Sequence, residues 1–145
     1  MSGRRLVLWF LGFVLLFGVA LYWFQVFAYY ERQKGVGALP VPGNPIPIAD
    51  YDGIDAASSP LKLRGCFRVD PVSVVSLPVA PEPTPLVAPF WFRCFDARGL
   101  SRDLAAGVAT ARLVAHDAPE GFDLLIATYP DGRGYLWRQL NERFQ

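Results

Sequence analysis

The 145-residue sequence has only one histidine, His116, one methionine and two cysteines. Structural zinc sites use about four cysteine and histidine ligands, and covalent haem attachment needs a C-x-x-C-H motif, so neither is expected. The sequence also has no G-x-S-x-G, no glycine-rich phosphate loop and no H-E-x-x-H. We therefore predict that the chain is not an enzyme and has no catalytic residue, no cofactor and no metal ligand.

An excess of positive charge is missing as well. Residues 35–145 contain 10 Arg and Lys against 12 Asp and Glu. Nucleic-acid binding needs a basic surface, and recognition of anionic lipid needs a polybasic face. The charge balance therefore argues against both kinds of partner.

Charge is absent altogether from residues 6–30, where Gln25 is the one strongly polar side chain. A helix of that length reaches about 37 Å and can cross the hydrocarbon core of a bilayer, which is about 30 Å thick. A cleaved signal peptide has a shorter apolar region and ends at a small-x-small site, which this run lacks. Aromatic residues near its two ends resemble interfacial belts: Trp9, Phe10, Tyr22, Trp23, Tyr29 and Tyr30. We predict an uncleaved transmembrane helix over residues 6–30, with the lipid bilayer as its first partner.

The orientation of this helix is not decided by charge, because Arg4 and Arg5 before it are balanced by Arg32 and Lys34 after it. Two other features favour one orientation. A short basic tail crosses a membrane with difficulty, and a cysteine pair suits an oxidising compartment. We expect residues 1–5 to be a cytoplasmic tail and the C-terminal domain to lie outside the cytoplasm.

All 13 prolines lie after the apolar run, and those at 40, 42, 45 and 47 predict an extended linker over residues 31–48. Residues 49–145 are predicted to form a small α+β domain with a mainly antiparallel sheet. The expected strands are 61–69, 90–95, 109–116, 122–129 and 134–140. A short helix or turn is expected at 51–59, and a short helix capped by Ser101 at 99–107. The expected core is Leu63, Phe67, Phe92, Leu113, Leu124, Ile126, Leu136 and Trp137.

Cys66 and Cys94 are the residues to which we assign a specific bond. In a small exported domain, a lone cysteine pair usually forms a structural disulfide. The bond would join the two ends of a proline-rich segment that cannot set its own geometry. A redox-active pair is the alternative, although catalytic dithiols usually have the C-x-x-C spacing at a helix start.

Two polar groups resemble sites but lack the arrangement that a site needs. His116 is followed by Asp117, but neighbouring residues on a strand point to opposite faces, so we expect a solvent-facing histidine at a turn. Asp50, Asp52 and Asp55 lack the ligand spacing and the closing glutamate of an EF-hand calcium loop. We expect this acidic group to be solvated.

Three segments resemble a known family: residues 54–67, residues 91–97 and residues 131–141, with two Cys-Phe dipeptides and an Asp-Gly-Arg-Gly-Tyr-x-Trp hairpin. The family is an uncharacterised group of single-pass membrane proteins of alphaproteobacteria, of the Rhodobacter and Roseobacter type, with a domain of unknown function. The resemblance implies a Gram-negative inner membrane and a periplasmic domain. It implies no activity.

Two functions follow as expectations. The first is a non-catalytic accessory subunit or assembly factor, docked by its helix to a larger membrane-protein complex. The second is a free-standing envelope module that binds a small ligand or senses a redox state. The aromatic-rich helix, the semi-rigid proline-rich spacer and the large apolar residues of the domain favour the first.

Overall fold

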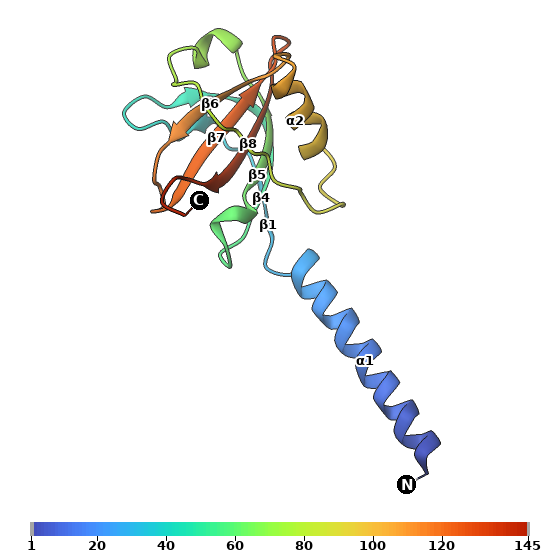
Figure 1. Ribbon diagram of the computed structural model, residues 1–145. Coiled ribbons are helices and arrows are strands. Elements are labelled where there is room, and N and C mark those ends of the chain that lie inside the picture. Colours follow the sequence, from blue (N-terminus) through green and yellow to red (C-terminus); the bar gives the residue numbers. More distant parts are fainter. Residues whose placement is uncertain (1, 145) are drawn as a thin grey trace.

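The computed structural model describes residues 2–144 and has one long apolar helix, α1, attached to a sheet domain (Figure 1). Helix α1 spans Gly3–Val26, and none of its residues is buried. Among the described residues it is the one helix long and apolar enough to cross a membrane. It begins and ends earlier than the predicted range of 6–30, because the chain leaves the helix after Val26 and turns through Tyr29, which has a φ of 69°.

The domain is built on a six-stranded antiparallel sheet in the order β1-β4-β5-β8-β7-β6. Its strands are β1 (Glu31–Lys34), β4 (Ala49–Asp55), β5 (Arg64–Arg68), β6 (Thr110–Ala115), β7 (Phe122–Thr128) and β8 (Arg133–Leu140). A small second sheet pairs β2 (Ala38–Leu39) with β3 (Ile46–Pro47). The helical elements are α2 (Ala97–Ala105) and the 3-10 turns η1 (Pro60–Lys62) and η2 (Pro71–Val74). The predicted α+β class with a mainly antiparallel sheet is confirmed.

The sheet has a hydrophobic core on each face. On one face Leu124, Ile126 and Leu136 pack with Leu39 and Ile46 of the β2–β3 hairpin. On the other face Leu125, Ala127 and Trp137 pack with α2 and the proline-rich segment before it, through side chains such as Phe92, Phe95 and Leu100. Because both faces are covered, Leu136 and Trp137 are both buried although they point in opposite directions. Of the predicted core, Leu113 is the exception, since it is only half-buried.

The predicted linker over residues 31–48 is wrong as a description of this segment. Residues 31–34 form an edge strand paired with β4, and Leu39 and Ile46 are buried in the core. Apolar side chains placed between the prolines have an apolar sheet face to cover, and their burial outweighs the extended preference of the prolines.

Three further local predictions are corrected. Residues 49–55 are strand β4 rather than a helix or turn, because pairing with β1 and β5 outweighs the low strand preference of Asp and Gly. Residues 90–95 form turns rather than a strand, and Phe92 and Phe95 are both buried. Helix α2 is capped by Asp96, whose side chain accepts a hydrogen bond from Gly99 N, and not by Ser101.

Gly134 leaves room for the aromatic ring of the residue opposite it on the neighbouring strand. Gly134 on β8 pairs with Phe67 on β5, and a Cβ at Gly134 would lie 2.3 Å from Phe67 Cε2. We expect Gly134→Ala to lower the free energy of unfolding by about 1–3 kcal/mol, because the buried Phe67 ring must move. Chemical denaturation measures the change, and Gly37→Ala is the control, since a Cβ there meets nothing within 4 Å. Equal effects of the two substitutions would contradict the prediction.

Candidate docking surface beside the N-terminal helix

The segment between Pro85 and Phe95, here called the junction loop, lies between the sheet domain and the end of α1. It has no regular secondary structure, and a turn is closed by the hydrogen bond from Phe92 N to Pro89 O at 2.9 Å. Phe92 and Phe95 point into the core that contains Trp137. These two rings anchor the junction loop to the core, but its backbone is not part of the sheet. Further contacts, described below, hold the loop.

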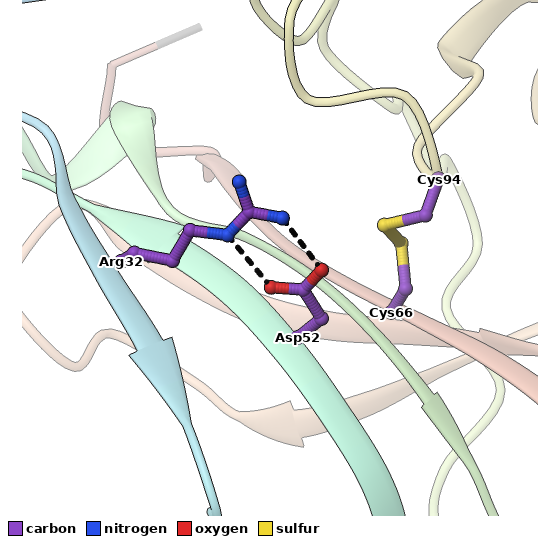
Figure 2. Close-up of a disulfide and its surroundings, with 4 residues drawn as sticks. All are labelled: Arg32, Asp52, Cys66 and Cys94. Atoms are coloured by element: carbon purple, nitrogen blue, oxygen red, sulfur yellow. Dashed lines mark hydrogen bonds and ion pairs between the residues drawn. A yellow bond between two sulfur atoms is a disulfide. The ribbon is translucent and has the colours of Figure 1, made fainter.

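The first contact is the cysteine pair. Cys66 on β5 and Cys94 in the junction loop form a disulfide, with an S–S distance of 2.14 Å and a Cα–Cα distance of 6.3 Å (Figure 2). The Cα separation lies inside the range of about 4.4–6.8 Å expected for a bridge. The structure therefore brings together the two residues that the sequence singled out, although Cys94 lies in a loop and not on a strand.

An ion pair lies next to the disulfide. Arg32 on β1 donates from Nε and Nη2 to the carboxylate of Asp52 on β4, at 3.0 and 2.8 Å (Figure 2). The hydrogen bonds from Arg32 lower the pKa of Asp52. Asp52 is the cross-strand partner of Cys66, and the Arg32 guanidinium lies 5.7 Å from the centre of the Phe92 ring. Strand β1 is therefore tied to the junction loop as well as to the sheet.

Arg64 supplies the most buried polar contact of the loop. Its side chain is 95% removed from solvent, and it donates to four main-chain carbonyls rather than to an acid. Nε donates to Leu86 O at 2.9 Å and Nη2 to Val87 O at 3.2 Å, so two of the four carbonyls belong to the junction loop. Desolvation lowers the pKa of Arg64 to about 10, still well above neutral pH, so the guanidinium stays charged there.

Trp91 connects the loop to the helix. Its Nε1 donates to the carbonyl of Val26, the last residue of α1, at 2.8 Å. Its ring stacks near Phe27 at 6.3 Å and meets Tyr30 edge-on at 5.5 Å. Lys62 Nζ lies 5.1 Å from the centre of the Tyr30 ring. The indole thus satisfies a carbonyl that a helix end leaves unpaired, and it joins the helix to the domain.

Apolar side chains on the outer side of this junction face solvent. Phe90 is 68% exposed and Val87 is 84% exposed, and the Phe90 ring lies 5.7 Å from that of Phe27. We call Phe27, Val87 and Phe90 the helix-proximal patch. These exposed apolar groups stand on a backbone that is held by a disulfide, an arginine and an indole.

The link between Trp91 and the helix can be tested with Trp91→Phe, which removes the donor and keeps an aromatic ring. We expect chymotrypsin to cut residues 27–30 several-fold faster in the variant embedded in lipid nanodiscs, because the chain after the helix loses a partner. Mass spectrometry of the fragments gives the rate. Trp23→Phe is the control, since Trp23 lies on the exposed surface of α1, and an equal acceleration in both would contradict the prediction.

His116 lies at the end of β6 with its side chain half exposed, as predicted, but it has acidic neighbours that the sequence did not indicate. Nδ1 lies 2.8 Å from Asp123 Oδ1, and Nε2 lies 3.4 Å from Glu142 Oε1. These three side chains have ligand-type atoms within 4.8 Å of one another. Asp123 Oδ1 also accepts hydrogen bonds from Asp117 N and Asn141 Nδ2. The arrangement is a polar network at the turn between β6 and β7, and we assign no metal to it.

The acidic group at residues 50–55 is not one cluster in the structure. Asp52 pairs with Arg32, and Asp55 Oδ2 lies 3.8 Å from Nη1 of Arg138 on the opposite face. Asp50 has a φ of 54° at the irregular start of β4. The three carboxylates therefore do not converge on one point.

The fold and the junction define a class of protein: a domain with an antiparallel sheet covered on both faces, attached to one apolar N-terminal helix. Residues 40–145 match the model of DUF6446, a family of unknown function, and the chain belongs to this family. No curated protein and no solved structure is significantly similar to the chain.

Proposed function

We propose that the chain is a non-catalytic, single-pass protein of the bacterial inner membrane that serves as an accessory subunit or assembly factor of a larger membrane-protein complex. In this proposal the N-terminus is cytoplasmic and the domain periplasmic, which is the topology that the resemblance to alphaproteobacterial membrane proteins implies. The observation that carries the proposal is the helix-proximal patch. It presents Phe90 and Val87 to solvent at the point where the domain meets α1.

The geometry supports docking to protein at this point for a physical reason. A single helix gives a partner one stripe of contacts and leaves the domain free to rotate about the connection. The bond from Trp91 to Val26, together with the ring contacts of Phe27 and Tyr30, restrains that rotation. Phe27 directly follows α1, and its ring lies 5.7 Å from that of Phe90, so the helix end and the patch adjoin. The loss of rotational freedom on docking is then smaller.

The orientation is tested with C-terminal reporter fusions. We expect an alkaline phosphatase fusion to be active and a green fluorescent protein fusion exported by the Sec route to be dark, because the C-terminus lies outside the cytoplasm. The opposite pair of results would reverse the orientation.

Docking is tested by purification from gently solubilised membranes. We expect the wild-type chain to be recovered in a fixed ratio with a larger membrane complex, and Phe90→Ser to lose that complex. A photoreactive residue at position 90 should crosslink to a subunit of the same complex. Val72 is the matched control, because it is 72% exposed and lies on η2, which is joined through Asp70 and Val69 to the end of β5 away from α1.

Recovery of the chain alone, with no protein crosslinked from position 90, would overturn the proposal. That result would favour the free-standing envelope module. An unchanged ratio in Phe90→Ser would show that the helix alone makes the contact.

A further inference from the structure

A cavity of about 250 Å³, open to solvent on one side, lies in the domain between the sheet and the chain that crosses it after β1. Its lining is mostly apolar, with Leu63, Leu124 and Leu136 from the sheet side and Leu39 from the β2–β3 hairpin. Each of these leucines is less than a tenth exposed. A cavity of about 150 Å³ lined by such side chains is large enough to hold benzene, so this one has room for an apolar ring with a short chain.

One cationic side chain lies among these apolar groups. Arg138 lines the cavity, and its Nε is buried without a hydrogen-bond partner among the described residues. Its nearest acid is Asp55, 3.8 Å from Nη1, which is an ionic contact but too long for a hydrogen bond. A buried donor without an acceptor is costly and is rare in folded proteins, so the Arg138 guanidinium is short of acceptors. Nε itself is shielded from the cavity, and a ligand would reach the guanidinium at its Nη atoms, which are not buried and make no hydrogen bond among the described residues.

The other polar groups at the cavity leave that role open to a ligand. Asp55 Oδ1 already accepts a hydrogen bond from Ala56 N at 2.8 Å. Tyr51 is mostly buried, and desolvation, with nearby Asp55 and Asp52, raises the pKa of its hydroxyl to about 12, so the hydroxyl is neutral. Gln33 completes the polar lining and carries no charge. Arg138 is thus the one cation and Asp55 the one acid among the lining residues.

The polar end of the cavity lies close to the helix. In the register of β1 and β4, Asp55 lies opposite Glu31, the first residue of β1. Strand β1 follows α1 after a short turn. A molecule that partitions into the bilayer surface is therefore concentrated at the end of the sheet where Arg138 and Asp55 lie. Amphipathic acids behave in this way, since the chain enters the lipid and the carboxylate stays at the headgroups.

We propose that this cavity binds a small amphipathic carboxylic acid, with its apolar ring or chain among the leucines and its carboxylate accepting a hydrogen bond from Arg138. A guanidinium suits a carboxylate because it offers several donors in one plane. This binding does not depend on docking to a membrane complex, and its test uses no partner protein.

The test uses the full-length chain in phosphatidylcholine nanodiscs and two probes that share one apolar body, 4-phenylbutyrate and 4-phenylbutylamine. Leucine methyl NMR signals report on the cavity, and protein-free nanodiscs correct for partitioning of the probes. We expect saturable shifts of the Leu124 and Leu136 methyl signals with the carboxylate, and binding of the amine at least tenfold weaker. No saturable shift with 4-phenylbutyrate up to 5 mM, or equal binding of the two probes, would overturn the proposal.

Variants locate the site. Arg138→Met keeps an apolar stem and removes the donor, so it should weaken 4-phenylbutyrate at least tenfold. The amine should bind no more weakly than to the wild type, because the substitution leaves Asp55 without its cationic neighbour. Arg98→Met is the matched control, since Arg98 is exposed on α2 and does not line the cavity, and it should bind like the wild type. Ala38→Phe fills the cavity and should abolish both kinds of binding.

If the leucine methyl NMR signals of Ala38→Phe lose their dispersion, the variant has not folded. The comparison of Arg138→Met with Arg98→Met then tests the binding site by itself. Unchanged carboxylate affinity in Arg138→Met would overturn the assignment. So would a folded Ala38→Phe variant that still binds the carboxylate as the wild type does.

Discussion

Cys66→Ser and Cys94→Ser should each lower the free energy of unfolding by about 3.6 kcal/mol, because each breaks the same cross-link. The two cysteines are 28 residues apart in sequence, and the bond closes a loop of this length in the unfolded chain. Opening it also removes one of the links between the junction loop and β5, so the helix-proximal patch loses one of its supports. Chemical denaturation of the oxidised proteins measures the two effects.

The double variant Cys66→Ser/Cys94→Ser is the control for this prediction. It should be no less stable than either single variant, since no second bond remains to be broken. Thiol alkylation of wild-type protein isolated without a reductant should find no reactive cysteine. Clearly unequal effects of the two single substitutions, or two alkylated thiols, would show that the pair is not a structural staple and would favour the redox-sensing alternative.

The C-terminal half of the fold could be predicted because its signals are local. Turn residues around Gly121 and Gly132 separate the three strands β6, β7 and β8, and the short helix before them has an amphipathic pattern. The strands therefore stand almost where periodicity places them. Their burial was harder to predict, since Leu124, Leu125, Ile126 and Ala127 are all buried. Such a run indicates a sheet covered on both faces, whereas the predicted core included only Leu124 and Ile126 of these four residues.

The N-terminal part of the domain could not be predicted in the same way, because its order depends on contacts distant in sequence. Arg32 finds its partner Asp52 only when β1 pairs with β4, and Leu39 is buried only because a sheet face lies beneath it. Read locally, the prolines predict an extended spacer, and the aspartates and glycine of 50–55 argue against a strand. Tertiary burial outweighed both local preferences.

The candidate site was predictable in one part. The count of cysteines and the expected compartment were enough to pair Cys66 with Cys94. The bond from Trp91 to Val26 joins residues 65 apart, and no spacing in the sequence indicates it. One local signal existed, because the aromatic side chains of Phe27 and Tyr30 continue past the end of the helix and need a surface to pack on.

Arg64 was not singled out by the sequence, and its replacement should have an effect as large as the loss of the disulfide. Arg64→Met should lower the free energy of unfolding by about 3–5 kcal/mol. The methionine fills most of the volume but leaves the carbonyls of Leu61, Leu63, Leu86 and Val87 without their donor. A hydrogen bond from a charged donor contributes about 1.5–3 kcal/mol, and part of the loss is recovered because the lost guanidinium no longer has to be desolvated.

Arg64→Lys separates the charge from the geometry of the donors. An ammonium has its three donors on a single nitrogen and cannot reach all the carbonyls that Arg64 contacts through Nε, Nη1 and Nη2. We therefore expect Arg64→Lys to restore less than half of the stability that Arg64→Met loses. Arg68→Met is the matched control on the same strand, because Arg68 is exposed and donates to a single carbonyl, that of Asp131 at 3.0 Å. It should change stability by less than about 1 kcal/mol. If Arg64→Met were as mild as Arg68→Met, the four carbonyls would be reaching water in the folded protein. The junction loop would then be held by the disulfide and the buried rings of Phe92 and Phe95, without the arginine.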